Sequence, residues 1–74
     1  MVLKGHISTL DDVKHINEVA SDMPFEVFVS SGNDMFDARS FLCLSAFIGK
    51  DVNIIVEDDI DDKVFAKMVK RMKV

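Results

Sequence analysis

The sequence predicts an α+β fold, a two-layer open-faced sandwich in which three helices cover one face of a four-stranded antiparallel sheet. Two observations lead to this fold class. Segments with strand and helix patterns follow one another in the order β-α-β-β-α-β-α. The second and third strands are joined by so short a turn that they must be antiparallel. With 74 residues, the chain has room for one domain, residues 1–74.

The first strand and the first helix are predicted from the N-terminal part of the chain. Residues 2–7 alternate in character, which is typical of a strand with its odd-numbered residues on one face. Thr9 is a good N-cap for a helix, and Asp12 completes a capping box with it. Apolar residues then recur at helical spacing, which predicts a helix over residues 10–21 that Pro24 prevents from continuing.

The middle of the chain predicts a hairpin followed by a short helix. Residues 25–30 are rich in β-forming side chains and predict the second strand. Residues 31–34, Ser-Gly-Asn-Asp, predict a tight turn, and residues 35–38 a short return strand. Residues 39–47 are apolar at almost every position, which indicates a short, largely buried helix, and Gly49 is a plausible C-cap.

The last strand and the last helix complete the predicted order. Residues 52–57 alternate cleanly, with the even-numbered side chains toward the core. The acidic run at residues 58–62 is expected to open the final helix, with four acids in its first turn, where they suit the helix dipole. The apolar stripe of this helix comprises Ile60, Val64, Phe65, Met68, Val69 and Met72.

The composition excludes several classes of function. The formal net charge is −4 and there is no Trp or Tyr, which argues against nucleic acid as the main partner. No apolar run is long enough to span a membrane, and the N-terminal run is too short for a signal peptide. The single cysteine, Cys43, rules out an internal disulfide and multi-thiolate metal sites, and it fits a reducing compartment. We therefore expect a soluble cytoplasmic protein.

Residues 37–44, Asp-Ala-Arg-Ser-Phe-Leu-Cys-Leu, together with the element order, resemble HPr, the histidine-containing phosphocarrier protein of the bacterial sugar phosphotransferase system. In that family a strand ends in Ala-Lys-Ser or a close variant, and an apolar helix follows at once. The serine is the target of a regulatory kinase in many Gram-positive members. The resemblance places Ser40 on that serine and Arg39 on the basic residue before it. The matching apolar residues after it are Phe41, Leu42 and Leu44.

The start of the first helix departs from this family. The phosphate-accepting histidine of HPr lies there in a Gly-x-His-x-Arg-Pro motif. Counting back from Ser40 without gaps places Thr9 at the histidine, Asp11 at the arginine and Asp12 at the proline. A threonine cannot carry a labile phosphoramidate, and Asp11 would repel the phosphate that an arginine attracts. The sequence therefore predicts a divergent HPr-like module that is not an enzyme and has lost histidine phosphotransfer.

Two histidines and a serine remain as candidates for chemistry. His6 follows Gly5, as in a truncated form of the family motif, so an active phosphocarrier that uses His6 stays open as an alternative. His15 falls on the polar side of the first helix, and an ordinary solvent-facing histidine is the simpler interpretation of both. Ser40 is an expected N-cap, where its hydroxyl would accept an N–H, and it is also a candidate for regulatory phosphorylation.

The remaining candidates point to contact with other proteins. Cys43 is expected to be an inert buried thiol. The acids at residues 58–62 lack the glycine and distal glutamate of a calcium loop, so we expect no metal and no cofactor. We expect phosphotransferase-system or regulatory proteins to dock on a face around Ser40. Its predicted contact residues are Arg39, Phe41, Leu44 and Phe47. A small structural or oligomerisation domain is a further alternative.

Overall fold

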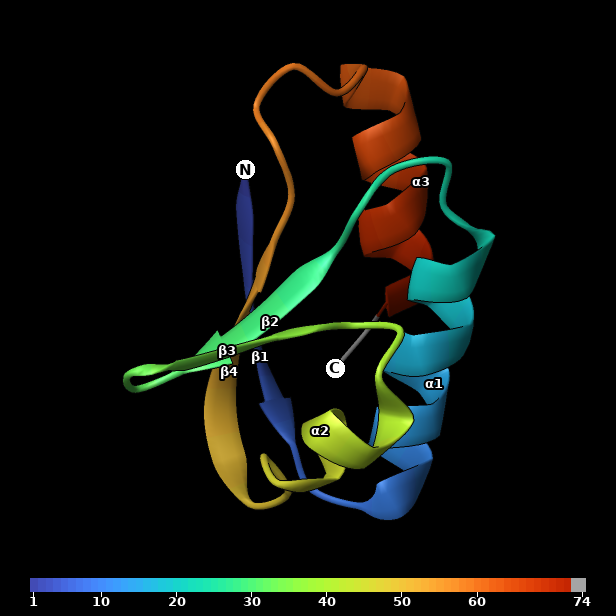
Figure 1. Cartoon of the computed structure of the whole chain (residues 1–74). Helices are drawn as coiled ribbons and strands as arrows, with labels where there is room; N and C mark the ends of the chain where they lie inside the picture. Colours follow the sequence, from blue (N-terminus) through green and yellow to red (C-terminus); the bar gives the residue numbers. More distant parts are fainter. Residues whose placement is uncertain (73–74) are drawn as a thin grey trace.

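The computed structural model describes residues 1–72 and confirms the predicted α+β fold and the order of its elements (Figure 1). Residues 73 and 74 of the predicted domain lie outside the described part. The strands are β1 (Val2–Ile7), β2 (Phe28–Ser31), β3 (Asp34–Asp37) and β4 (Lys50–Ile55). The helices are α1 (Leu10–Asp22), α2 (Phe41–Ser45) and α3 (Asp62–Met72).

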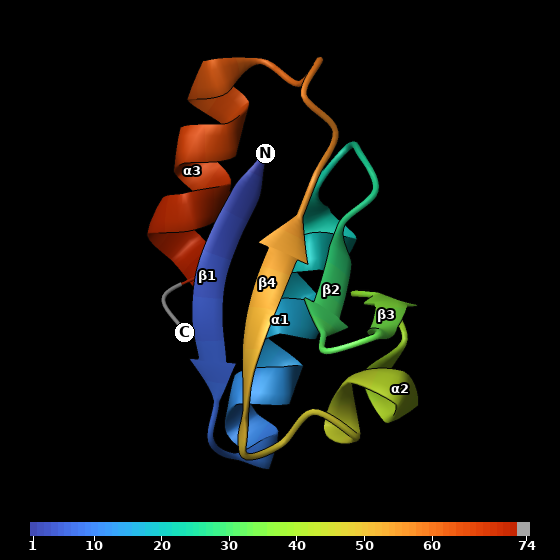
Figure 2. The same ribbon diagram turned by 90° about the vertical axis from the view of Figure 1, so that its left-hand side faces the viewer.

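The four strands form one antiparallel sheet in the order β1-β4-β2-β3, and the helices lie on one side of it (Figures 1 and 2). A two-residue turn joins β2 to β3, and Gly32 in this turn has a φ of +60°, which a side chain disfavours. The last strand, β4, inserts between β1 and β2, so that β1 and β3 are the two edges. Its central position follows from its alternating pattern, because the buried Ile54 pairs with both Leu3 and Val29.

The core lies between the sheet and the helices. The apolar face of α1 is buried, and so are Val52 and Ile54 of β4 and the two methionines Met68 and Met72 of α3. The fully or almost fully buried apolar residues are Ile7, Val13, Ile16, Val19, Ala20, Val27, Val29, Ala38, Leu44, Phe47, Val52, Ile54, Val56, Met68 and Met72. Burial on this scale is what stabilises so short a chain.

The other face of the sheet is not covered by any helix of the described chain, and Figure 2 looks onto it. We call it the open face. Because side chains alternate along a strand, the register places one set of residues there. These residues are Val2, Lys4, His6, Phe28, Ser30, Met35, Asp37, Asp51, Asn53 and Ile55.

Every predicted element except the first strand differs from the structure in its bounds: α1 ends at Asp22 rather than at residue 21, β3 is Asp34–Asp37 rather than 35–38, and β4 is Lys50–Ile55 rather than 52–57. Three further differences concern β2, α2 and α3. β2 begins at Phe28 rather than at residue 25, since residues 23–25 form a bend; the N–H of Ala38 donates to the carbonyl of Val27 at 2.8 Å and extends the β2–β3 pairing by one step. α2 ends at Ser45, and the chain then tightens into turns with bonds such as the Phe47 N–H to the Leu44 carbonyl at 2.9 Å.

The third difference concerns the acidic run before α3. The helix begins at Asp62, so its first turn holds one of the four expected acids, and the prediction of four was wrong. Asp61 caps the helix instead. Its carboxylate accepts the N–H of Lys63 at 2.8 Å, and its carbonyl accepts the N–H of Phe65 at 3.0 Å. The sequence contains several acids that can cap a helix, and packing selects one of them.

Candidate functional site

The start of α1 is closed by side-chain caps in this chain. The carboxylate of Asp12 accepts the N–H groups of Ser8 at 2.8 Å and Thr9 at 3.0 Å. The N–H of Asp12 in turn reaches the Thr9 hydroxyl at 3.3 Å, which completes the predicted capping box. These N–H bonds, led by that of Ser8, lower the pKa of Asp12 below its ordinary value of 3.8. The Asp12 carboxylate therefore already binds the N–H groups that an anion at this helix start would need.

Ser40 occupies the N-cap position of α2, but it does not cap the helix as predicted. Its hydroxyl accepts no capping N–H, and the N-cap backbone has a φ of −90°. The main chain makes the local bonds instead. The Ser40 N–H donates to the Asp37 carbonyl at 3.0 Å, and the Ser40 carbonyl accepts the N–H of Leu44 at 3.0 Å. The half-buried hydroxyl is thus not used in shaping the helix start.

The guanidinium of Arg39 is engaged with the loop between α1 and β2. It donates to the carbonyls of Met23 and Phe25, both at 3.3 Å. The Arg39 N–H also donates to the Asp37 carboxylate at 2.9 Å. Arg39 is exposed, but its guanidinium is bound to backbone carbonyls. It therefore anchors the segment before α2 to the loop between α1 and β2.

Two of the predicted docking residues are in the core, which corrects that part of the expected face. The Leu44 side chain is 0% exposed and that of Phe47 is 1% exposed, and the Phe47 ring packs on Phe36 with centroids 5.2 Å apart. Their side chains are therefore unavailable to a partner in this conformation. Phe41 is half-buried and packs against the core, so only its outer edge meets solvent.

The residue of α2 that does face solvent is Leu42, which is 81% exposed. Ile48, just after the helix, is exposed as well. Helical spacing predicts that Leu42 lies on a different face from Phe41 and Leu44, because residues three apart in a helix share a face. We call the set formed by the exposed Arg39, Leu42 and Ile48 and the half-buried Phe41 the α2 surface. Cys43, beside it, is half-buried rather than fully buried.

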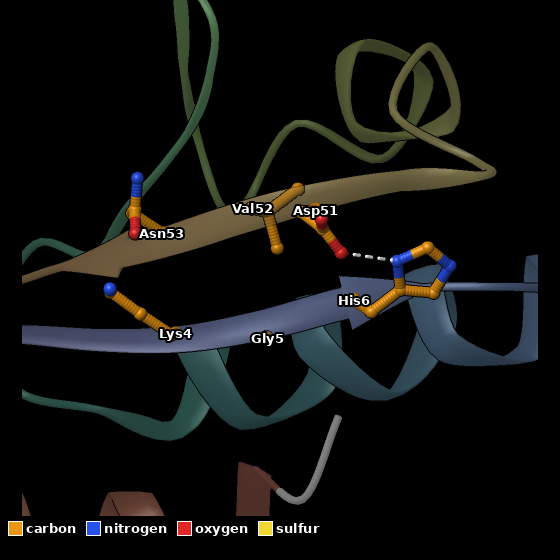
Figure 3. A pocket seen from close by; sticks show the side chains of 6 residues that line it. All are labelled: Lys4, Gly5, His6, Asp51, Val52 and Asn53. Atoms are coloured by element: carbon orange, nitrogen blue, oxygen red, sulfur yellow. Dashed lines mark hydrogen bonds and ion pairs between the residues drawn. The ribbon is translucent and has the colours of Figure 1, made fainter.

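His6 lies on the open face and pairs with an acid of the neighbouring strand (Figure 3). Its Nδ1 atom is 2.7 Å from the Asp51 carboxylate, and the two residues are direct partners in the β1–β4 register. Because an ionised carboxylate only accepts hydrogen bonds, Nδ1 carries the proton and Nε2 is left for other contacts. The hydrogen bond orients the His6 ring, but the negative charge of the Asp51 carboxylate beside it would oppose an incoming phosphoryl group. No sequence pattern predicts this pair, since it depends on the register of β1 against β4.

His15 and the acidic residues of the described chain do not form a catalytic or metal-binding group. The Nε2 atom of His15 contacts the carbonyl of Arg71 and so links α1 to α3. Among residues 1–72, no group of three or more His, Cys, Asp or Glu side chains is placed to hold a metal ion. Within the same residues, no helix is long and apolar enough to cross a membrane.

Arg39, Ser40, Phe41 and Leu42 follow one another at the start of α2, whereas Thr9 lies at the start of α1 and His6 lies in β1. Comparison of the chain with protein-family models and with curated proteins gives no match.

Proposed function

We propose that this chain is an HPr-like, non-catalytic module that binds other proteins through the α2 surface. The observation that carries the proposal is the exposure of Leu42, at 81%, within the stretch that resembles the family motif. Leu44 and Phe47 bury the inner side of the same segment, so the outer side is free for a partner. Apolar side chains on a rigid, well-anchored element are typical centres of protein interfaces.

The start of α1 supports the loss of phosphotransfer. The N–H groups of Ser8 and Thr9, which would otherwise be available to an anion, bond to the Asp12 carboxylate. A phosphoryl group there would have to displace this carboxylate and would meet the negative charge of Asp11 as well. The N-cap of this helix is Thr9 rather than a histidine.

The resemblance indicates the class of partner. We infer that phosphotransferase-system components or regulatory proteins dock on the α2 surface in the bacterial cytoplasm. Ser40 provides a means of control, since its hydroxyl is not used in capping and lies two residues before Leu42. Phosphorylation there would add charge beside the apolar contact and would change affinity for a partner that inserts Leu42 into a pocket.

The binding claim is tested by calorimetric titration of the chain with enzyme I and with the serine kinase of the system. We expect Leu42→Lys to weaken binding at least about tenfold, because the charge would have to enter an apolar contact. Leu10→Lys is the matched control, since Leu10 is also exposed but begins α1. Equal loss in both variants, or none in either, would refute the α2 surface as the docking site.

The alternative, a phosphocarrier that uses His6, rests on the position of His6 after Gly5, as in a truncated form of the family motif. Incubation with enzyme I and labelled phosphoenolpyruvate separates the two functions. We expect no acid-labile label on the chain. Label that disappears in His6→Ala would establish the phosphocarrier and overturn the non-catalytic proposal.

A further inference from the structure

A groove opens between two loops at the end of the molecule where α3 begins (Figures 1 and 2). One loop joins α1 to β2, and the other joins β4 to α3. The groove has a volume of about 490 Å³, within the range of about 300–1,000 Å³ that is usual for binding sites. Loops held by a rigid scaffold are a common place for such sites.

The groove has an apolar floor. Phe25 comes from the first loop, Ile60 from the second loop and Val64 from the first turn of α3. All three side chains are half-buried, and those of Phe25 and Ile60 also pack against the core. Packing against the core therefore holds the floor in place, while its outer side stays open to a ligand.

Four exposed carboxylates line the same groove, and they come from both loops. Glu26 belongs to the first loop, and Glu57, Asp59 and Asp61 belong to the second. Capping of α3 explains Asp61, which accepts the N–H of Lys63, but it does not explain Glu26 or Glu57. We call the groove formed by the apolar floor and these four carboxylates the acidic groove.

The charge of the acidic groove is not balanced within residues 1–72. In that part of the chain, no lysine or arginine lines the groove, and none of its four carboxylates forms an ion pair. Arg39 donates to the Phe25 carbonyl at 3.3 Å, but it does not line the groove. Because carboxylates gathered around one groove repel one another, a cationic occupant is favoured.

Lysine and arginine side chains suit both parts of the acidic groove, since each carries a cationic head on an aliphatic stem. The stem can lie on the apolar floor while the head donates hydrogen bonds to a carboxylate. Because the acids come from both loops, a chain with several cations can bond to both loops at once. An apolar floor between acidic loops therefore favours a peptide segment with an apolar side chain between cationic ones.

We propose that the acidic groove binds a basic segment of a partner protein, in which arginine or lysine side chains flank an apolar side chain. The apolar side chain packs on the floor, and the cations bond to Glu26 of one loop and to Glu57 and Asp59 of the other. The acidic groove shares no residue with the α2 surface, so this inference does not depend on the proposed function.

NMR titration of the full chain with a synthetic peptide tests this proposal. The peptide is Gly-Arg-Arg-Gly-Leu-Gly-Arg-Arg-Gly, blocked at both ends. The titration is run at about 0.15 M salt, where the Debye length is about 8 Å and remote charges are screened. We expect saturable amide shifts at Phe25, Ile60 and Val64, which line the groove. Replacing the central leucine of the peptide by glycine is expected to weaken binding at least about threefold, because the floor then loses its apolar contact.

Two charge-matched variants test the acids. Glu26→Lys combined with Glu57→Lys is expected to weaken peptide binding at least about tenfold. Glu18→Lys combined with Asp34→Lys is the control, because it makes the same change in net charge at two exposed acids that do not line the groove. We expect this control to weaken binding less than about threefold, since salt screens distant charges. Far-UV circular dichroism checks that both variants fold.

Several results would overturn the proposal. They are an absence of shifts at the groove up to about 2 mM peptide, a concentration that detects even millimolar affinity, equal loss in the two double variants, and equal affinity for the leucine and glycine peptides. Shifts of the same groove amides when the chain alone is concentrated would assign the groove to a second copy instead. The peptide comparison uses the unaltered chain, so it decides the matter even where a variant fails to fold.

Discussion

Thr9 and Ser40 both precede a helix and carry a hydroxyl, but they use it differently. Thr9 exchanges hydrogen bonds with Asp12 in a reciprocal capping box, whereas the Ser40 hydroxyl accepts no capping N–H. α1 has thirteen residues and depends on its cap, while α2 has five and is held by buried Leu44 and by the bonds of Arg39 to the preceding loop. The same side chain therefore has a structural role at one helix and is available for regulation at the other.

The difference between the two hydroxyls predicts a difference in stability. Thr9→Ala is expected to lower the free energy of unfolding by about 1 kcal/mol, because it removes one half of the capping box. Ser40→Ala is the control, and we expect a change below about 0.5 kcal/mol. Urea denaturation measures both. An equal loss of stability in the two variants would show that Ser40 caps its helix after all.

Asp12 also makes the stability depend on pH. Its pKa is lowered in the folded chain by the Ser8 and Thr9 N–H groups, so the unfolded chain binds its proton more readily. The stabilisation is present above the unfolded pKa, near 3.8, and is lost as the pH falls through the lower folded pKa. We expect Asp12→Asn to flatten the dependence of the urea midpoint on pH below about pH 4. A dependence as steep as that of the wild type would contradict this origin.

Among the elements, α2 shows how one short segment divides between core and surface. Leu44 and Phe47 are buried, whereas Leu42, two residues before Leu44, is exposed. Composition alone indicated a buried helix, which is correct for its inner side. The predicted docking set included Leu44 and Phe47, which are buried, and left out the exposed Leu42, which lies off the face that Phe41 and Leu44 share.

This division predicts opposite outcomes for two leucine truncations in the same helix. Leu44→Ala is expected to cost about 2–5 kcal/mol of unfolding free energy, because it opens a cavity among fully buried neighbours. Leu42→Ala is expected to change it by less than about 0.5 kcal/mol while weakening partner binding. Chemical denaturation of both variants checks the first statement. A large destabilisation by Leu42→Ala would place that side chain in the core rather than on the α2 surface.

At the scale of the whole molecule, the sequence predicted the fold class but not the contents of the open face. Alternation and the hairpin turn were enough for the antiparallel sheet and its single helical layer. The β1–β4 and β2–β4 pairings are between strands far apart in the chain, and their register decides which residues share a row. Three features of the open face follow from that register: the His6–Asp51 pair, the adjacent apolar residues Val2, Ile55 and Phe28, and the hollow beside Lys4. No local sequence pattern predicts the register between strands that are far apart in the chain.

The net charge acts at this same scale. With −4 on the chain, an acidic partner is repelled and a neutral or basic protein surface is favoured. The α2 surface carries Arg39 beside Leu42, so it combines an apolar contact with a cation within an acidic molecule. That combination supports selective docking on α2 rather than general adhesion to the acidic surface.

One NMR titration tests the proposed function most directly. Isotope-labelled chain is mixed with enzyme I and phosphoenolpyruvate, while amide shifts and the phosphorus spectrum are followed together. If the chain binds through the α2 surface, we expect amide shifts at Phe41, Leu42 and Ile48, without a phosphoramidate signal. Shifts confined to β1 around His6, with a phosphoramidate signal that His6→Ala removes, would contradict it and make the chain a phosphocarrier.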